Sequence, residues 1–485
     1  MPARVQDTRP NVIIFFTDQQ RWDCSGLHGN PLELMPNFDR LARAGTNVRN
    51  SFTCQPVCGP ARACLQTGTF ATTTGCWQNG IALPTDRQRF PTLASCFNEA
   101  GYRTGYIGKW HLGGPEGMVG ETRGAVKPSH RGGYQDWLAA EALEFSVDEY
   151  HTVLYDNDNQ PIALPGYRSD ACTDAAIRYI HQHHRDPFYL MVSYIEPHHQ
   201  NDKDDYPPPV GYRERYAGRW TPPDLAALPQ WHWHQDRAAG EPMLIGGSTQ
   251  QHLGGYWGMV KRLDEGLGRL VDTLISLDLL DNTIILFTSD HGCHFKTRNA
   301  EYKRSCHETS LRVPTMLHGG GFTAGGELPQ MVSLVDLPPT LLDACGIAVP
   351  DQMQGRSLLP LVRRDARAWA DWPEEAFFQI SESQIGRGVR TARWKYSVCA
   401  APEAEVREGA ADHYVEEFLY DLHHDPYELC NLVNLDSHEG VRKVLRNRLL
   451  RRMDQIGERP ARIDPSPMPS ARGGQRTVSD AEALS

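Results

Sequence analysis

Short, continuous apolar runs alternate with amphipathic segments through the first two thirds of the chain. Asn11–Phe16, Phe188–Ile195 and Thr283–Thr288 are rich in β-branched and aromatic residues without polar interruptions. Such runs are typical of strands that are covered by helices on both faces. Helical spacing separates the runs, most clearly in Tyr256–Leu280, where apolar side chains follow one face. The repeated order predicts an α/β fold: a large, mostly parallel sheet sandwiched by helices.

Other segments extend this pattern or interrupt it. Residues 101–108 and 311–317 have the composition of strands, whereas residues 115–170 lack periodicity and are expected to form an irregular excursion. Residues 200–250 are expected to form a long loop, in which Trp231-His232-Trp233-His234 is either an aromatic wall of a substrate pocket or a loop packed on the surface. Helices are predicted over Met35–Arg43, Phe90–Ala100, Ala171–His184 and Val332–Cys345.

The pattern changes beyond residue 370. Arg363–Glu375 is polar and reads as a linker, and four short strand-like runs then precede a helix over Val441–Ile456. The sequence therefore predicts a catalytic α/β domain at 1–370 and a small C-terminal α+β subdomain with an antiparallel sheet at 371–456. The remaining residues, 457–485, form a polar tail that is expected to be disordered unless a neighbouring subunit of a homo-oligomer holds it.

Composition excludes several classes of function. The chain has 485 residues, 40% hydrophobic, and a net charge of −11, which disfavours binding to nucleic acid or to an anionic membrane. The first apolar run is too short for a signal peptide, and no stretch is long enough to span a membrane. The twelve cysteines are scattered rather than spaced as a disulfide framework, so most are expected to be reduced. We expect a cytoplasmic protein.

Polar residues recur where the predicted strands end. Carboxyl ends of parallel strands meet at one edge of a sheet, and ligands of open α/β folds bind there. Taken singly, each residue has a simpler explanation: Asp18 as a helix cap and His111 as a surface residue. Four strands nevertheless deliver chemistry to the same edge, through Asp18, Lys109 with His111, His198, and Asp290 with His291.

The segment Cys58-Gly59-Pro60-Ala61-Arg62 has its own local logic. Pro60 is suited to the first turn of a helix, which places Cys58 at a helix N-terminus. Arg62 lies one turn further along the same face. A nucleophile beside a permanent cation suits attack on a sulfate or phosphate ester, whereas the alternative is a buried cysteine near a helix start.

Taken together, these motifs resemble those of a known family. The resemblance covers about residues 10–455 and is to the type I (formylglycine-dependent) sulfatases of the alkaline-phosphatase-like superfamily. It is carried by Asn11–Gln20, Cys58–Gly68, GKWHLG at 108–113, Pro197-His198, SDHG at 289–292, Lys303, Arg312-Val313-Pro314, Gly355–Leu358, Tyr420–Leu422 and Asp425-Pro426.

The resemblance implies a modified nucleophile. A formylglycine-generating or sulfatase-maturating enzyme would oxidise Cys58 to formylglycine, with Pro60 and Arg62 completing the modification signal. One hydroxyl of the hydrated aldehyde would attack sulfur, and the other would lose its proton to regenerate the aldehyde and expel sulfate. The implied metal ligands are Asp18, Asp290, His291 and the oxidised Cys58.

Hard oxygen donors favour Ca²⁺ as the divalent cation, with Mg²⁺ or Mn²⁺ as alternatives. The sequence departs here from the commonest family pattern. It has Asp18-Gln19 where many relatives have two aspartates, and His291 where many have asparagine. Fewer charges and an imidazole move the preference toward manganese or another transition ion.

The resemblance also implies the substrate-handling residues and the activity. Lys303 or His198 would protonate the leaving oxygen of an aryl or carbohydrate sulfate monoester, the small-molecule substrate. Phosphonate monoester or phosphodiester hydrolases of the same superfamily are an alternative, since they share Asp-Gln and Asp-His, although Lys109-Trp110-His111 is the sulfatase pattern. A second alternative is a non-catalytic binding protein, if Cys58 is not oxidised. The catalytic candidates are Cys58, Arg62, Lys109, His111, His198 and Lys303, and the substrate-binding candidates are Gln19, Asn79, Lys109, His198 and Lys303.

Overall fold

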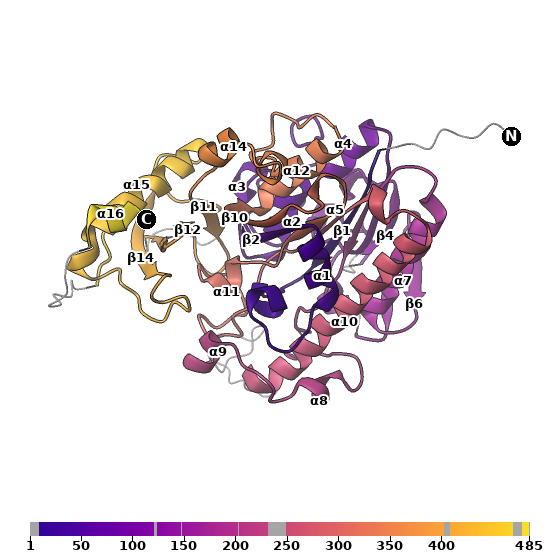
Figure 1. The fold of residues 1–485 in the computed structure, drawn as a ribbon, viewed down its shortest axis with the longest axis horizontal. Helices are drawn as coiled ribbons and strands as arrows, with labels where there is room; N and C mark the ends of the chain where they lie inside the picture. Colours follow the sequence, from indigo (N-terminus) through magenta and orange to yellow (C-terminus); the bar gives the residue numbers. More distant parts are fainter. Residues whose placement is uncertain are drawn as a thin grey trace.

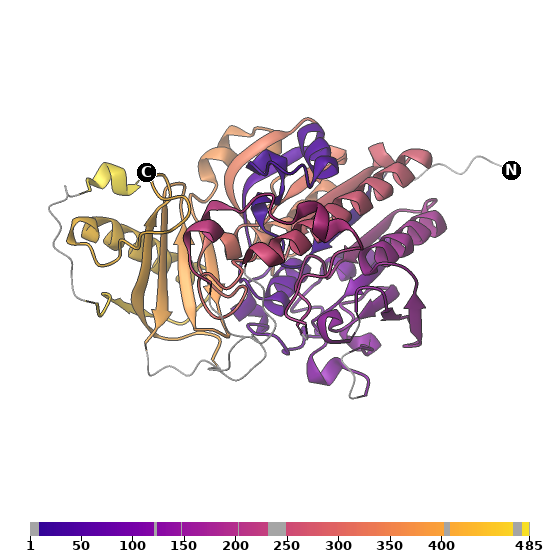
Figure 2. The ribbon, with the colours of Figure 1, turned by 90° about the horizontal axis from the view of Figure 1, so that it is seen from below.

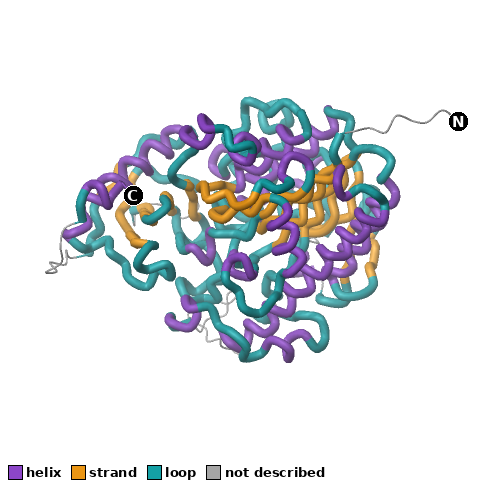
Figure 3. The backbone as a smooth tube through the Cα atoms, viewed as in Figure 1, coloured by secondary structure: helices purple, strands orange, loops and turns teal. Residues whose placement is uncertain are grey.

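The computed structural model describes residues 9–120, 124–146, 148–201, 203–230, 249–401, 408–468 and 478–484. Its centre is a ten-stranded sheet with the order β10-β2-β9-β8-β1-β7-β3-β4-β5-β6, which forms a layer between helices (Figures 1 and 3). The middle strands run parallel: β8 (Thr283–Ser289), β1 (Asn11–Thr17), β7 (Phe188–Ser193), β3 (Arg103–Lys109) and β4 (Asp136–Ala140).

Helices cover both faces of this sheet, as the uninterrupted apolar runs predict. In β1, Val12, Ile14 and Phe16 pack into one core, and Ile13 and Phe15 pack into the other. Both faces of the strand are therefore covered by core side chains, and every residue of β1, β7 and β8 is buried. One face carries α2 (Cys58–Thr67), α4 (Leu93–Glu99) and α12 (Leu337–Ala344), and the other carries α1 (Pro36–Ala44), α7 (Arg168–His183) and α10 (Thr249–Ser276).

Several strands depart from the expectation. The segment 115–170 is not irregular, because β4, β5 (Thr152–Tyr155) and β6 (Pro161–Leu164) extend the sheet at one edge. At the other edge, β10 (Gly326–Ser333) occupies the start of the predicted helix 332–345, and the helix begins only at Leu337. The remaining strands of this sheet are β2 (Thr46–Phe52), which the periodicity did not indicate, and β9 (Met316–His318), which is shorter than predicted.

A second, five-stranded sheet lies beside the first (Figure 2). Four strands pair antiparallel, as predicted: β11 (Ala376–Ile380), β12 (Gly386–Arg390), β13 (Trp394–Ala400) and β14 (His413–Asp421). The predicted helix is α15 (Glu439–Gln455), which packs against β12 and β13. The fold is therefore an α/β body with a smaller α+β part.

The polar tail is ordered where the structure describes it. β15 (Arg462–Asp464) pairs with β14, and α16 (Asp480–Leu484) buries Ala483 against the core. The expectation of disorder is wrong for these segments, because Ile463 and Ala483 supply apolar anchors that a compositional argument overlooks.

A buried charge cluster joins the two sheets. Lys395 on β13 lies 2.8 Å from Glu308 and 2.6 Å from Glu428, and Arg390 on β12 lies 3.3 Å from Glu308. Glu308 begins α11 (Glu308–Leu311), which belongs to the first part of the chain. The pairing compensates charges that would be costly to bury alone.

Within the described ranges, none of the helices combines the length and hydropathy that a bilayer crossing requires. The Trp231–His234 cluster lies outside the described residues. The short helices are α3 (Ala71–Thr74), α5 (Gly114–Gly117), α6 (Leu143–Ser146), α8 (Tyr212–Tyr216), α9 (Pro223–Ala227), α13 (Leu359–Val362) and α14 (Ala366–Asp371).

Candidate active site

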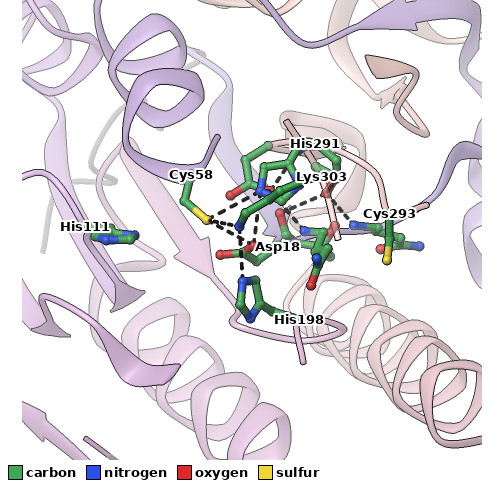
Figure 4. A network of polar contacts seen from close by, with 12 residues as sticks. Asp18, Cys58, His111, His198, His291, Cys293 and Lys303 are labelled. Atoms are coloured by element: carbon green, nitrogen blue, oxygen red, sulfur yellow. Dashed lines mark hydrogen bonds and ion pairs between the residues drawn. The ribbon is translucent and has the colours of Figure 1, made fainter. Parts of the chain in front are cut away.

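The strand ends bring the predicted polar residues together at one edge of the large sheet. Asp18 follows β1, His198 follows β7, and Asp290 with His291 follows β8. Lys109 is the last residue of β3. In Figure 4 the side chains of Asp18, His198 and His291 point toward Cys58 and Lys303.

Helix α2 starts at Cys58, as the Pro60 pattern predicts, and all ten of its residues are buried. The N-cap residue, Val57, has no side chain that could cap the helix. Instead, the backbone N–H of Gly59 donates to Oδ1 of Asn79 at 2.9 Å. Gly68 closes the helix with φ +64°, a left-handed conformation that glycine adopts without strain. The helix therefore fixes Cys58 at a buried, electropositive helix end.

Four potential ligand atoms surround one point beside Cys58. Single donor atoms of Asp18, Cys58, Asp290 and His291 all lie within 4.8 Å of one another. Cys58 Sγ is 3.4 Å from His291 Nε2 and 3.6 Å from Asp18 Oδ1. Because His291 Nδ1 lies 2.9 Å from the carbonyl oxygen of Gly292, we assign the ring proton to Nδ1, which leaves the Nε2 lone pair facing the cluster.

Electrostatics within the cluster favour a bound cation. Burial and the neighbouring Asp18 carboxylate raise the pKa of Asp290. Burial also opposes ionisation of Asp18, but the charges of Lys109 and Arg62 outweigh it and hold the pKa of Asp18 well below its ordinary value. Asp290 Oδ2 has no hydrogen-bond partner among the described residues. Two adjacent carboxylates fit a divalent cation, whose charge would compensate both acids, although the Arg62 guanidinium already lies 3.2 Å from Asp290 Oδ2.

Arg62 and Lys109 balance these carboxylates from the other side. Arg62 donates to Asp18 Oδ2 at 2.9 Å and to Ser193 Oγ at 2.7 Å, and it lies 3.2 Å from Asp290 Oδ2. Lys109 Nζ lies 2.7 Å from Asp18 Oδ2 and 2.9 Å from Glu144 Oε1. Each cation is shared between two acids, which fixes its position tightly.

Lys303 and His198 form a hydrogen-bonded pair beside Cys58. Lys303 Nζ donates to Cys58 Sγ at 2.9 Å and lies 3.2 Å from His198 Nε2. Burial and the Lys303 ammonium lower the pKa of His198, so the ring is neutral near pH 7. Its Nδ1 lies 2.6 Å from the carbonyl oxygen of His199 and carries the proton, so Nε2 accepts from Lys303. Burial likewise opposes ionisation of Cys58, yet Lys109 and Lys303 lower the pKa of its thiol well below the ordinary value.

A cavity of about 370 Å³ opens onto Cys58. Among the predicted residues, Asn79, His111, His198 and Lys303 line it with Cys58. Gln19 does not: its Oε1 accepts from the backbone N–H of His199, and its own N–H donates to Asp290. The structure thus places Gln19 behind the cluster rather than on the cavity wall.

Four charged residues that the motifs did not indicate line the same cavity: Glu141, Glu144, Arg304 and Glu382. Glu144 contacts Lys109, lies 3.7 Å from His111 Nδ1, and keeps one carboxylate oxygen without a hydrogen-bond partner among the described residues. Arg304 and Glu382 line the outer wall of the cavity. Only the position of Arg304 next to Lys303 was a signal in the sequence.

The geometry agrees with the family comparison. Residues 10–347 match the family model described as Sulfatase, and residues 300–455 match the one described as N-sulphoglucosamine sulphohydrolase, C-terminal. The chain belongs to the sulfatase family. The activity of this sulfatase is the hydrolysis of sulfuric esters. The family match confirms the predicted family and enzyme class, and the large sheet between helices confirms the predicted fold class.

Named relatives of this sulfatase extend over most of its length. It is 29% identical to an ulvan-active sulfatase from Formosa agariphila over 469 residues, covering 93% of this chain and 83% of the relative. It is 26% identical to an N-acetylglucosamine-6-O-sulfatase from Bacteroides thetaiotaomicron over 517 aligned positions, covering 92% and 86%.

Solved structures share the fold of this sulfatase. BT4656, solved in complex with its substrate D-glucosamine-2-N,6-O-disulfate, superposes with a TM-score of 0.72 at 24% identity, covering 92% of this chain and 98% of that chain. The phosphonate monoester hydrolase SpPMH from Silicibacter pomeroyi superposes with a TM-score of 0.68 at 21% identity, covering 93% and 96%. At these identities the likeness shows the fold alone.

Proposed function

We propose that this sulfatase hydrolyses an aryl or carbohydrate sulfate monoester through a formylglycine made from Cys58, with the help of one divalent cation. The observation that carries the proposal is the surrounding of Cys58. Its Sγ lies 3.4 Å from His291 Nε2 and 2.9 Å from Lys303 Nζ, and Cys58 lines the cavity.

The side chains around Cys58 fit a hydrated formylglycine and a divalent cation. Hydrated formylglycine would supply a hydroxyl nucleophile, and a divalent cation would lower its pKa and compensate charge. Asp18, Asp290, His291 and the converted side chain of Cys58 would hold the cation. Carboxylate oxygens favour Ca²⁺, and His291 admits Mn²⁺ better than an all-oxygen set would.

The fixed cations of the chain then bind the sulfate group. Lys109 and Lys303 both reach Cys58 Sγ, at 3.7 and 2.9 Å, so their ammonium groups flank the position of a sulfate that meets this side chain. Arg62 neutralises Asp18 and Asp290 and holds them in place. This arrangement stabilises negative charge that develops on the leaving and equatorial oxygens.

Proton donation to the leaving oxygen falls to Lys303 or His198. Lys303 carries its protons on the cavity side, where it also contacts Cys58. Neutral His198 has its only ring proton directed at the carbonyl oxygen of His199. We therefore assign the proton donor to Lys303 and the orientation of its ammonium to His198.

Phosphonate monoester hydrolysis is the second candidate. Asp18-Gln19 and Asp290-His291 favour it, whereas Lys109, which reaches both Asp18 and Cys58, favours the sulfatase. Turnover of 4-nitrophenyl sulfate and of a phenylphosphonate monoester would be compared on protein made together with a formylglycine-generating enzyme. We expect faster sulfate release, and a strong phosphonate preference would refute the proposal.

Mass spectrometry of the peptide that contains Cys58 tests the nucleophile itself. We expect a loss of about 18 Da relative to the thiol, because an aldehyde replaces it. Protein that carries only the thiol in its native host would instead support the binding-protein alternative. The cytoplasmic location stays a prediction, and fractionation of cells of the native host would test it.

A further inference from the structure

The outer wall of the cavity is built by a pair of charged residues from distant parts of the chain. Arg304 follows Lys303, and Glu382 lies in the loop between β11 and β12 of the second sheet. Their side chains form an ion pair and both line the cavity, with 10% and 19% of each side chain exposed. The second sheet thus contributes directly to the site.

This pair is connected to the start of α2. Glu382 Oε1 accepts from the backbone N–H of Asn79 at 2.6 Å, and Asn79 Oδ1 in turn accepts from Gly59, the neighbour of Cys58. Arg304 also pairs with Glu301, and its Nε has no hydrogen-bond partner among the described residues. The wall is therefore held at a defined distance from the reacting residue.

The backbone at both positions is strained. Arg304 has φ +63° and Glu382 has φ +67°, in the left-handed region that residues with a Cβ rarely adopt. Such strain is costly and persists at ligand clamps, where it presents a side chain that a relaxed backbone would not. His111, which also lines the cavity, has φ +59°.

The rest of the lining has the chemistry of a polyol site. The polar contributors beyond the catalytic candidates are Asn79, Asn201, Glu141 and Glu144, and the larger apolar ones are Pro115 and Met118. Within the described part of the chain, no phenyl, phenol or indole ring lines this cavity. An aryl leaving group would gain little here, whereas sugar hydroxyls would find carboxylate, amide and guanidinium partners.

We propose that the Arg304–Glu382 pair binds hydroxyl groups of the leaving alcohol, so that the substrate is a sulfated carbohydrate rather than an aryl sulfate. The inference rests on the proposed function and narrows it. Arg304 donates and Glu382 accepts, which matches two neighbouring hydroxyls of a sugar ring. A site built to hydrogen-bond a hydroxyl discriminates strongly against substrates that lack it, because its own polar groups are then left unpaired.

The test measures a ratio of specificities. Sulfate release is followed for 4-nitrophenyl sulfate and for a panel of glucosamine and galactose monosulfates, using the full chain with Cys58 converted. The wild type is expected to have a higher kcat/KM for at least one sugar sulfate than for the aryl sulfate. Glu382→Gln and Arg304→Gln are expected to lower the ratio of sugar to aryl kcat/KM by at least about 10-fold, mainly through KM.

Glu301→Gln is the matched control, because Glu301 pairs with Arg304 but does not line the cavity. Its sugar-to-aryl ratio is expected to stay within about 2-fold of wild type. The inference is overturned if every sugar sulfate is slower than the aryl sulfate, or if the Glu382 and Arg304 variants leave the ratio unchanged. Absence of sulfate release from all substrates refutes the proposed function itself, which is a different result from aryl-only activity.

Discussion

Replacing Glu144 by glutamine removes one of the two acids that share the Lys109 ammonium. In the wild type, Lys109 Nζ lies 2.7 Å from Asp18 and 2.9 Å from Glu144, with no exposed surface. With the second anion gone, the ammonium is drawn toward Asp18 and away from the sulfate position beside Cys58. Glu144 is therefore a positioning residue, and its loss should act on the reaction through Lys109.

The magnitude follows from the contact. A charge pair at 2.9 Å is worth about 6 kcal/mol at an effective dielectric constant of about 20, before desolvation is subtracted. Glutamine keeps an acceptor oxygen, so the net loss is that of a charge-assisted hydrogen bond, about 1.5–3 kcal/mol. If Lys109 is needed in the transition state, kcat/KM falls roughly 10- to 150-fold.

The assay is steady-state sulfate release with kcat and KM resolved, together with a thermal melt. We expect Glu144→Gln to lower kcat rather than to raise KM, because the displaced Lys109 ammonium stabilises the transition state more than the bound substrate. Glu141→Gln is the control for kcat: Glu141 is also buried and accepts from the N–H groups of Gly113 and Gly114, but it has no contact with Lys109 within the described residues. Because Glu141 lines the cavity, any effect of this variant on alcohol binding should appear in KM. A Glu144 variant with kcat within about 2-fold of wild type, or a Glu141 variant with the same kcat loss, would refute the reasoning.

Three further measurements test other parts of the site and fold. Removal of metal by a chelator should abolish sulfate release and lower Tm, because Asp18 and Asp290 would lose their compensating charge, and added Ca²⁺ should restore both; full activity without metal contradicts the ligand set. Lys303→Ala should lower kcat about 10²- to 10⁴-fold, with a larger loss for sulfate esters of poor leaving groups, whereas an equal loss for all esters argues against proton donation. Burial raises the pKa of Glu417 from 4.5 to about 7, so ionising this group destabilises the fold progressively as pH rises through this window. Glu417→Gln should therefore raise Tm at pH 8 and leave it unchanged at pH 4, and an equal gain at both values contradicts the shift.

The central strands and the core of the site were accessible from sequence because each rests on local pattern. The apolar run of β1 requires cover on both faces, and Asp18 directly follows it. Asp290 directly follows β8, and Lys109 is the last residue of β3. A strand end is a local feature, and parallel pairing then brings separate strand ends together.

Edge strands and the outer wall were not accessible in this way. β10 contains Pro329, which argues against a strand, and the structure accommodates it at an irregularity in the pairing of an edge strand. Glu144 lies in a stretch without periodicity, so nothing local marks it as the partner of Lys109. Glu382 reaches the cavity only because the second sheet packs against the segment that carries Arg304, a contact between residues 78 positions apart.

The charge cluster of Glu308, Lys395 and Glu428 limits how this architecture can be recombined. A fragment that ends before β11 would keep Glu308 but lose Lys395, leaving a carboxylate without the ammonium 2.8 Å away that compensates it. A second sheet grafted from a relative would meet the same mismatch unless its own lysine arrived in register. The unit that can be exchanged with these ion pairs intact therefore runs from the Lys303–Glu308 segment through the second sheet, and it carries the Arg304–Glu382 pair of the cavity wall with it.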